Sequence, residues 1–248
     1  MRKFGLIGYP LSHSFSKKFF TEKFIAEEIK NAAYELYPIE HIDLFSALVS
    51  DDPELCGMNV TIPYKVKVLP FLDEMDEAST QIGAVNCISI EWAENGKRYL
   101  KGYNTDAYGF EESLKPMLGE AHRRALVFGD GGAAKAIKYV LGKLGIDFLV
   151  VTRKPSETSI LYSEVDEAML SEYSVLINTT PLGMSPSYDT QPEIPYQFLT
   201  EQHVAYDLVY NPEETLFLKE VRLHGGKTKN GLEMLYLQAI RSWEIWNK

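Results

Sequence analysis

The sequence is poor in cysteine and has no long apolar run. Its 248 residues include only two cysteines, Cys56 and Cys87, which are far apart and form no CxxC pair. A disulfide framework and a zinc site are therefore unsupported, and a reducing cytoplasm is the expected compartment. No window approaches the roughly 18 apolar residues of a membrane span. The opening "MRKFGLIGYP" is broken by Gly5, Gly8 and Pro10, so no signal peptide is expected.

Positive charge is also scarce. The chain has 25 lysines and arginines against 35 aspartates and glutamates, which gives a formal net charge of -10. This balance excludes sequence-independent binding to nucleic acid or to an anionic membrane surface, so any anionic ligand must find a local positive site. The proportions of hydrophobic residues (45%) and charged residues (24%) are those of an ordered globular protein. The length permits one large α/β unit or two smaller domains.

Short β-rich runs alternate with helical patterns almost from end to end. This alternation predicts an α/β fold with parallel strands and helices packed on the sheet faces. Strands are predicted at residues 3–8, 33–39, 55–62, 124–129, 147–152, 174–180 and 203–210. Residues 83–92 and 97–104 form a predicted hairpin, with Asn95-Gly96 at its turn. A helix with Phe20, Phe24, Ile25 and Ile29 on its apolar stripe is expected after the first strand.

The new strand–helix–strand series that begins near Arg124 marks a domain boundary. A helix between Thr105 and Leu118 is expected to join the two parts. The final stretch, "LEMLYLQAIRSWEIW", is a long amphipathic helix that is expected to pack back on the first domain. We therefore predict a discontinuous first domain, residues 1–106 plus 231–248, and a second domain, residues 107–230.

The segment "VFGDGGAAKAI" places three glycines between a predicted strand and a predicted helix. Glycine there lets backbone N–H groups approach a pyrophosphate at the positive end of the helix. The pattern is G-x-G-G-A-A, with Ala134 in the third small position. A glycine cluster can also serve a purely steric turn, but the βαβ context favours a dinucleotide site. The candidate loop is Gly129, Asp130, Gly131, Gly132, Ala133 and Ala134.

The residues at the end of the next predicted strand indicate which dinucleotide the chain would bind. A site for NAD would offer Asp or Glu to the ribose hydroxyls, whereas this chain has Thr152, Arg153 and Lys154. The planar fork of Arg153 and the point charge of Lys154 could hold a 2′-phosphate. NADP is therefore the predicted cofactor. The alternative is a solvated basic pair in a turn.

Four polar clusters, "SHSFS", "NVTIPYK", "GAVN" and "NTD", fall at predicted strand ends or helix starts. Such ends form the ligand crevice of open α/β sheets. Taken singly, Ser14 and Ser16 could cap a helix, and Asn59, Thr61 and Asn86 could be turn formers. Together these amides and hydroxyls suit a small polyhydroxylated molecule, whose OH groups each need a directed partner.

In this combination and order the motifs resemble the shikimate dehydrogenase family, over nearly the whole chain. The matching segments are "SHSFS" (12–16), "NVTIPYK" (59–65), "GAVN" (83–86), "NTDAYGF" (104–110), "GDGGAAKA" (129–136), "INTTPLGM" (177–184), "YDLVYNPEETLFL" (206–218) and "NGLEMLYLQA" (230–239). The resemblance implies NADPH-dependent, reversible reduction of 3-dehydroshikimate to shikimate, a step in aromatic amino acid biosynthesis. It also implies two α/β domains around a cleft, of which the C-terminal one is a Rossmann-type NADP-binding domain.

The resemblance also implies roles for individual residues. The family's catalytic pair falls on Lys65 and Asp106. The candidate substrate-binding residues are Ser14, Ser16, Asn59, Thr61, Lys65, Asn86, Asp106, Tyr210 and Gln238. The candidate cofactor-binding residues are Gly129, Asp130, Gly131, Gly132, Ala133, Ala134, Thr152, Arg153, Lys154, Thr179, Met184, Leu208 and Gly231. This chain departs from the family in having Lys17 where proline is frequent, and Thr152-Arg153-Lys154 where Asn-Arg-Thr is frequent.

Reduction of a ring ketone requires a hydride at carbon and a proton at the developing alkoxide. A positioned general acid contributes roughly 10²–10⁴-fold, and Lys65 is the candidate donor. Pro63 suits the first turn of a helix, so Lys65 is expected where the chain leaves its strand. A neighbouring carboxylate favours the charged form of an ammonium, which opposes any lowering of the lysine pKa. Asp106 is therefore expected to orient Lys65 and to bind a substrate hydroxyl, and not to activate Lys65 electrostatically.

Histidine is the usual alternative acid, and no metal site is predicted. Of five histidines only His13 falls in a site motif, where a turn role is expected. The other four, His41, His122, His203 and His224, are expected at the surface. No spacing of His, Cys, Asp or Glu predicts a metal centre.

Two other functions remain open. One is a relative that acts on quinate or another cyclohexane polyol, possibly with NAD, which the pair Arg153-Lys154 disfavours. The other is a dinucleotide-sensing regulator without chemistry, which the presence of both Lys65 and Asp106 disfavours. In each case the expected partner is a small molecule, with no nucleic acid and no membrane, and the protein is expected to be a monomer or a homodimer.

Overall fold

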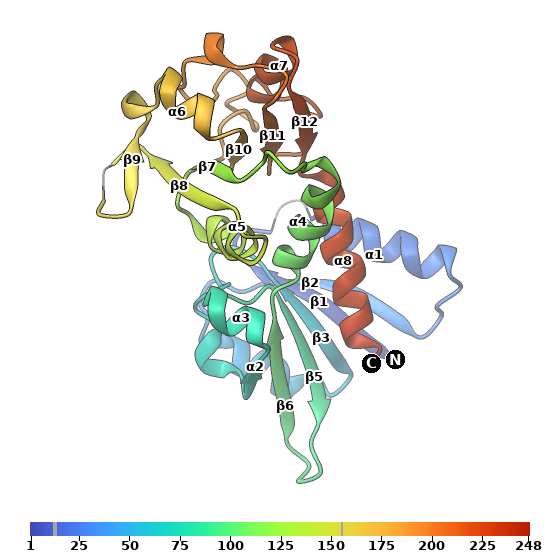
Figure 1. Cartoon of the computed structure of the whole chain (residues 1–248). Helices are drawn as coiled ribbons and strands as arrows, with labels where there is room; N and C mark the ends of the chain where they lie inside the picture. Colours follow the sequence, from blue (N-terminus) through green and yellow to red (C-terminus); the bar gives the residue numbers. More distant parts are fainter. Residues whose placement is uncertain (12–13, 155) are drawn as a thin grey trace. The chain divides into compact units, whose positions relative to one another are not determined.

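The computed structural model describes residues 1–11, 14–154 and 156–248 and divides the chain into two compact units (Figure 1). Unit 1 consists of Met1–Thr105 and Gln238–Lys248, and unit 2 of Asp106–Leu237. Both ends of the chain therefore belong to unit 1. Two helices, one at each junction, run from one unit into the other.

Unit 1 contains a six-stranded sheet with the strand order β2-β1-β3-β5-β6-β4. Its strands are β1 (Arg2–Gly8), β2 (Ala32–Pro38), β3 (Leu55–Val60), β4 (Glu74–Met75), β5 (Cys87–Trp92) and β6 (Arg98–Tyr103). β1 pairs in parallel with β2 and β3, whereas the β5–β6 hairpin adds antiparallel pairs. Gly96 has a φ of +75° at the hairpin turn, which confirms the turn predicted at Asn95-Gly96.

The helical segments of unit 1 are α1 (Phe15–Ala26), α2 (Leu44–Asp51), η1 (Leu69–Phe71), α3 (Glu77–Ile82) and the last part of α8 (Leu232–Trp246). In α1 the predicted stripe is confirmed for Phe20 and Phe24, which are buried. It is wrong for Ile25, which is 74% exposed. Ile25 follows Phe24 by one residue and is rotated about 100° toward solvent, and Ile29 lies beyond the end of the helix.

The end of α8 completes the core of unit 1. Trp246 stacks on Phe4 with ring centroids 4.9 Å apart, and its Nε1 donates to the carbonyl of Ile88 at 2.9 Å. A Cβ added at Gly57 would lie 2.3 Å from the indole of Trp246, so only glycine leaves room for that ring. The amphipathic final helix therefore packs on the first unit, as predicted.

Unit 2 contains six parallel strands in the order β12-β11-β10-β7-β8-β9. They are β7 (Arg124–Phe128), β8 (Asp147–Thr152), β9 (Ser159–Leu161), β10 (Val175–Asn178), β11 (Val204–Asp207) and β12 (Lys227–Asn230). Counted within the unit, this order is the 3-2-1-4-5-6 arrangement of the Rossmann fold. The chain reverses direction across the sheet between β7 and β10, which is the switch point where such sheets bind ligands.

The helical segments of unit 2 are α4 (Thr105–Leu114), η2 (Lys115–Met117), α5 (Gly132–Lys143), η3 (Tyr162–Glu164), α6 (Glu167–Glu172), η4 (Tyr196–Phe198), α7 (Leu216–Leu223) and the start of α8. The apolar face of α5, which includes Ile137, Val140 and Leu141, is buried. Leu126, Phe128 and Leu176 belong to a second buried cluster. Strands β9 and β12 were not predicted, because β9 has three residues and β12 reads "KTKN" without an apolar alternation.

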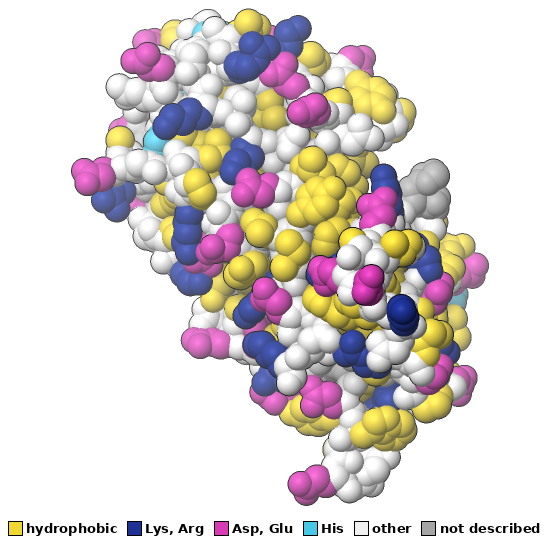
Figure 2. Space-filling model, turned by 90° about the vertical axis from the view of Figure 1, so that its right-hand side faces the viewer, with side chains coloured by type: hydrophobic (Ala, Val, Ile, Leu, Met, Phe, Trp, Pro, Cys, Tyr) yellow, Lys and Arg dark blue, Asp and Glu magenta, His cyan; other side chains and the backbone are white. Residues whose placement is uncertain are grey.

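The surface is mixed in charge on the face that Figure 2 shows, where basic and acidic side chains are interspersed. Within the described residues, no helix combines the length and the apolar content that a membrane span requires.

Candidate active site

The strands of unit 1 bring three of the predicted polar segments to one edge of the sheet. Asn59 pairs with Cys87 in the β3–β5 register, and Cys87 pairs with Tyr103 in the β5–β6 register. Because β5 runs antiparallel to both neighbours, its start meets the carboxyl ends of β3 and β6. The N–H of Val60 donates to the carbonyl of Asn86 at 2.8 Å. "NVT", "GAVN" and "NTD" therefore lie side by side.

A buried hydrogen-bond network fills this edge. The Asn86 side chain, 3% exposed, accepts the N–H of Thr105 at 2.6 Å and donates to Thr105 Oγ1 at 3.0 Å. From α8, Ser242 Oγ lies 3.3 Å and Gln238 Oε1 3.5 Å from Thr105 Oγ1. The network therefore brings together Asn86 and Gln238, which are 152 positions apart and were both predicted to bind substrate.

Asn59 extends the network and uses both of its amide hydrogens within the protein. Its Nδ2 donates to the carbonyl of Asn86 at 3.2 Å and to Ser242 Oγ at 2.9 Å. Its Oδ1 accepts from the hydroxyl of Tyr34 at 2.8 Å. Asn59 is 4% exposed, so its amide fixes the sheet edge. Neither Tyr34 nor Ser242 was predicted, because neither belongs to a polar cluster at a strand end.

The two predicted serines lie at the start of α1. Ser14 is the N-cap, and its hydroxyl accepts the N–H of Lys17 at 3.3 Å. The side chain of Ser16 hydrogen-bonds the phenol of Tyr34, and burial raises the pKa of that phenol well above its ordinary value. Ser16 is thereby linked to Asn59 through one shared partner. Residues 12 and 13 of the motif, and with them the prediction for His13, lie outside the described residues.

Lys65 lies where the chain leaves the sheet, as predicted. A cis bond joins Ile62 to Pro63, and the residues that follow form turns rather than the helix that Pro63 suggested. The carbonyl of Lys65 accepts the N–H of Val85 at 2.8 Å, which ties this turn to the "GAVN" segment. Asp106 lies in the first turn of α4 and begins unit 2. It directly follows Thr105, the centre of the buried network.

The glycine turn of unit 2 requires glycine for two separate reasons. Gly129 follows β7 with a φ of +96°, which L-residues rarely adopt. A Cβ at this position would lie 2.7 Å from Thr180 and 3.0 Å from Thr179 Oγ1. The tight turn then delivers the chain to α5.

The start of α5 is open and electropositive. Gly131 is the N-cap without a side-chain hydrogen bond, and a Cβ at Gly131 or Gly132 would meet no atom within 4 Å. Ala134 is fully buried at the third small position. Free approach to helix N–H groups is what a pyrophosphate requires. The carboxylate of Asp130 pairs with Lys138 at 2.5 Å, which offsets a negative charge in this turn.

The basic pair is exposed at the end of β8. Thr152 Oγ1 donates to the carbonyl of Lys154 at 2.6 Å, which shapes the turn. The side chains of Arg153 and Lys154 project from that turn into solvent. Both are therefore available to an anion at the carboxyl edge of the sheet.

The remaining cofactor candidates occupy loops at the same edge. Thr179 follows β10, and its Oγ1 donates to the carbonyls of Phe128 (2.8 Å) and Gly129 (3.2 Å). Gly231 follows β12, and a Cβ there would lie 2.2 Å from the carbonyl oxygen of Leu208, so only glycine allows this close approach. Met184 is 47% exposed, and the substrate candidate Tyr210, in the loop after β11, is 42% exposed. Since all six strands are parallel, these loops share one edge with Gly129 and Arg153.

A buried carboxylate that was not predicted connects these loops. Asp207 ends β11 and is fully buried. It accepts hydrogen bonds from Asn178 Nδ2 at 3.0 Å, from the N–H of Val209 at 3.0 Å and from Thr215 Oγ1 at 2.6 Å. Burial raises the pKa of the Asp207 carboxyl to about 6, although these three hydrogen bonds act in the opposite direction. A lone aspartate that ends an otherwise apolar strand, "HVAYD", was the available signal.

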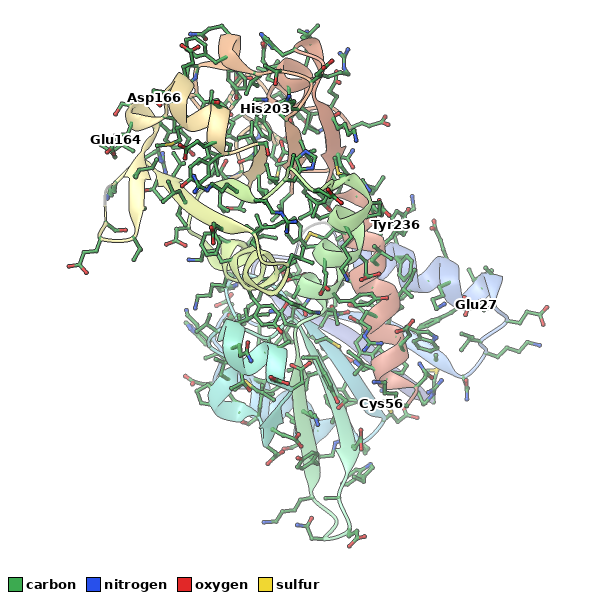
Figure 3. The ribbon with its side chains drawn as sticks, viewed as in Figure 1. Glu27, Cys56, Glu164, Asp166, His203 and Tyr236 are labelled. Carbon is green, nitrogen blue, oxygen red and sulfur yellow. The ribbon has the colours of Figure 1, made fainter. Side chains whose placement is uncertain are left out.

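The structure corrects one prediction for the histidines. His203 is 3% exposed and lies inside unit 2 (Figure 3), so its predicted surface position is wrong. Its Nδ1 accepts the N–H of Thr200 at 3.0 Å, and its Nε2 lies 3.0 Å from the carbonyl of Leu170. The ring thus satisfies backbone groups between β11 and α6. Among the residues that the structure describes, no three His, Cys, Asp or Glu side chains are placed to hold a metal ion.

Comparison with known proteins decides the family. Residues 6–88 match the family described as "Shikimate dehydrogenase substrate binding domain". A protein from Desulforamulus reducens named shikimate dehydrogenase (NADP(+)) is 36% identical over 263 residues, which cover 98% of this chain and 88% of that protein. The chain belongs to the shikimate dehydrogenase family.

Solved structures of shikimate dehydrogenases share the fold. The enzyme from Thermus thermophilus, in complex with NADP(H) and shikimate, has a TM-score of 0.84 and 31% identity, covering 99% of this chain and 93% of that one. A quinate dehydrogenase from Corynebacterium glutamicum, in complex with NAD, has a TM-score of 0.85 and 26% identity with the same coverage. The predicted family and α/β fold class are confirmed.

Proposed function

We propose that this chain catalyses the reversible, NADP-dependent reduction of 3-dehydroshikimate to shikimate. The observation that carries the proposal is the 36% identity, over 98% of the chain, to a protein named shikimate dehydrogenase (NADP(+)). The buried polar edge of unit 1 and the Rossmann-type edge of unit 2 support it independently, because each has the chemistry that one of the two reactants requires.

Unit 2 fits an NADP molecule. The open start of α5 and the strained Gly129 suit the pyrophosphate, and the exposed Arg153 and Lys154 suit the 2′-phosphate. Thr179, Met184, Leu208 and Gly231 would flank the nicotinamide end. When bound, the cofactor supplies the hydride that the reduction needs.

Unit 1 would hold the substrate. The hydroxyls of Ser14 and Ser16 at the start of α1 suit its carboxylate, because a helix N-terminus favours an anion. Asn86 and Gln238 would contact ring hydroxyls, with Thr61 and Tyr210 lining the site. Asn59 would act through Asn86 and Tyr34, since both its amide hydrogens are already used within the protein.

Lys65 would donate the proton to the developing alkoxide and stabilise its charge. The negative charge on the alkoxide develops only in the transition state. A cation that stabilises this charge lowers the activation barrier of the reduction without making the substrate bind more tightly in the ground state. Asp106 would orient Lys65 and accept a hydrogen bond from a substrate hydroxyl. We assign the catalytic pair to these two residues, and the first and second predicted domains to substrate and NADP respectively.

A second candidate function is oxidation of quinate. It is kept because the quinate dehydrogenase from Corynebacterium glutamicum has a TM-score as high as that of the shikimate enzyme from Thermus thermophilus. The exposed basic pair Arg153-Lys154 favours NADP over NAD in either case.

We further propose a reducing compartment and a monomeric or homodimeric protein. Cys56 and Cys87 are both unpaired, and burial raises the pKa of the Cys87 thiol to about 12. A thiol in that state is unreactive and needs no disulfide partner. Light scattering of the purified protein would give the oligomeric state.

The test is a matrix of two polyols and two cofactors. Purified protein is assayed for reduction of NADP or NAD with shikimate or quinate, by absorbance at the wavelength of the reduced nicotinamide. We expect the highest kcat/KM with shikimate and NADP. A preference for quinate would select the second function, and binding of NADP without turnover of any polyol would indicate a sensor.

A further inference from the structure

The buried carboxylate of Asp207 hydrogen-bonds several structural elements whose relative positions matter for the proposed reaction. Its Oδ1 accepts from the side chain of Asn178 at 3.0 Å, and the two residues pair in the β10–β11 register. The same oxygen accepts the N–H of Val209, in the loop that follows β11. Its Oδ2 accepts the hydroxyl of Thr215 at 2.6 Å, and Thr215 is the N-cap of α7. One carboxylate thus connects three separate segments.

Asn178 carries this connection into the loop after β10. Its Oδ1 accepts both the N–H (3.0 Å) and the hydroxyl (2.6 Å) of Thr180, while its Nδ2 lies 3.4 Å from the carbonyl of Leu182. The next residue along from Asn178, Thr179, hydrogen-bonds the carbonyls of Phe128 and Gly129. The path from Asp207 therefore reaches the glycine turn.

Val209 carries the connection to the start of α8. Its carbonyl accepts the N–H of Gly231 at 3.2 Å, and Gly231 packs directly on the backbone of Leu208. The N–H of Leu208 donates to the carbonyl of Asn178 at 3.0 Å. Four loops at the cofactor edge, after β7, β10, β11 and β12, are linked through this one group.

We propose that Asp207 is the positioning residue of the cofactor site, fixing the loops after β10 and β11 in the geometry that receives the nicotinamide end of NADP. This inference rests on the proposed function, because it assumes that these loops contact NADP. The geometry supports the assignment. A fully buried carboxylate is unfavourable unless hydrogen bonds satisfy it, and those of Asp207 come from the last residue of β10, from the loop after β11 and from the cap of α7.

The surroundings of Asp207 contain no compensating cation among the described residues. The groups that lower the pKa of Asp207 are neutral donors from β10, from its own loop and from the N-cap of α7. Burial, and then the charges of Glu220 and Asp207, raise the pKa of the Tyr196 phenol in η4. The hydrogen bonds alone hold the carboxylate. Hydrogen bonds to a charged acceptor are about twice as strong as neutral ones, so replacing the charge weakens all three together.

The experiment compares NADP binding in matched variants by titration calorimetry. Asp207→Asn keeps the shape and removes the charge, Thr215→Val removes one donor, and Thr215→Ser restores it. We expect Kd for NADP to rise about tenfold in the first two variants and to stay within about threefold of wild type in the third. KM for shikimate should change less than Kd for NADP in all three, because Tyr210 is the one proposed substrate residue that lies in these loops.

Glu111→Gln is the control for general loss of stability. Glu111 is also a buried carboxylate of unit 2, 7% exposed, but its ion-pair partners Lys115 and Lys143 lie in η2 and α5 and not in these loops. NADP affinity should be unchanged in this variant. Hydrogen exchange should show faster exchange of residues 179–184 and 208–215 in Asp207→Asn, and not in Glu111→Gln.

Two results would overturn the assignment while leaving the proposed function intact. One is wild-type NADP affinity in Asp207→Asn and Thr215→Val. The other is an equal loss of affinity in Glu111→Gln, which would show that any destabilisation of unit 2 has this effect. If Asp207→Asn fails to fold, the Thr215 pair decides the question. Failure of the wild type to bind NADP would instead reject the proposed function itself.

Discussion

Gly129 is the residue at which backbone conformation and cofactor chemistry are most closely coupled. Its φ of +96°, and the 2.7 Å that would separate an added Cβ from Thr180, leave no substitute for glycine. This conformation turns the chain from β7 into α5. A side chain here would move the start of α5, where a pyrophosphate is expected to bind.

Gly129→Ala should therefore lose about 2 kcal/mol or more of unfolding free energy, because a left-handed conformation alone costs an L-residue about 1–2 kcal/mol. NADP binding should be lost with it. Gly142→Ala is the matched control: Gly142 lies inside α5 with no atom within 4 Å of an added Cβ, so the variant should gain about 0.5–1 kcal/mol. Denaturant unfolding of both variants tests this, and a stable Gly129→Ala that binds NADP would contradict it.

Lys65 is the residue on which the proposed chemistry depends. Lys65→Ala should lower kcat by about 10²–10⁴-fold while KM for shikimate changes little, because the ammonium acts on charge that develops during the reaction. Lys67→Ala is the control, since Lys67 is an exposed lysine two residues along the same turn segment. Steady-state kinetics with shikimate and NADP decide it. Full activity in Lys65→Ala would remove the proton-donor assignment.

At the scale of elements, both units place several of their candidate residues just after the carboxyl ends of strands. The turn after β8 is a clear case, because the two basic side chains project from it on the same edge as the glycine turn. Arg123, by contrast, lies immediately before β7, at the opposite edge of the same sheet. Position in the strand, and not charge alone, therefore separates a candidate phosphate ligand from an ordinary surface arginine.

Arg153→Ala should raise KM for NADP by about ten- to a hundredfold and leave KM for NAD unchanged, because charge-assisted hydrogen bonds to the 2′-phosphate are lost. Arg123→Ala should change neither value. Kinetics with both cofactors would show the difference. An equal rise in KM for NAD would mean that Arg153 supports the loop and does not recognise the phosphate.

Asp207, at the end of β11, leads to a separate prediction about how the unfolding free energy depends on pH. The pKa of Asp207 is raised to about 6 in the folded protein, against about 3.9 in an unfolded chain. A raised carboxyl pKa means that stability is highest below the unfolded value and is lost as the pH rises through the folded value. Asp207→Asn lacks this loss. Its unfolding free energy relative to wild type should therefore increase between pH 4 and pH 6, by roughly 3 kcal/mol in all, and stay constant above. A difference that does not vary with pH would refute the shift.

The sequence was sufficient to predict the elements whose conformation is determined by residues adjacent in the chain. The glycine turn and the Asn95-Gly96 hairpin were predicted from adjacent residues, because turn geometry is determined by the residues within it. The short edge strands β9 and β12 were missed, since their pairing depends on neighbours distant in the chain. The Asp207–Asn178–Thr215 contacts were missed for the same reason.

The candidate site was predictable in part. Residue types at strand ends predicted which segments would lie together at one edge of each sheet, because parallel strands present their carboxyl ends together. The cap that Ser14 forms on α1 was one of the roles that the sequence offered. The role of Asn59 was not predictable, because its side chain bonds Tyr34 and Ser242, which only the folded structure brings close.

At the scale of the molecule, unit 2 is one continuous segment inserted between the two segments of unit 1. The two segments of unit 1 meet where Trp246 enters the space above Gly57 and stacks on Phe4. The hydroxyl of Ser242 joins the polar edge from the same helix. The last turns of α8 are therefore part of both the core and the candidate substrate site.

Trp246→Ala should destabilise unit 1 by about 3–5 kcal/mol, because it empties a buried site the size of an indole. Trp92→Ala is the control: Trp92 is 59% exposed at the end of β5 and contacts Arg98, so about 1 kcal/mol or less is expected. Hydrogen exchange resolved by unit would show loss of protection in unit 1 with unit 2 retained. Equal loss in both units would mean that they unfold together.

The place of Trp246 after unit 2 in the sequence also sets an order of events during translation. Residues 106–237 are all synthesised before the last turns of α8, which carry Ser242 and Trp246. The earlier-made β1 and β3 meanwhile remain with the space above Gly57 unfilled. Unit 1, although its synthesis starts first, can thus be completed only after all of unit 2 has been synthesised.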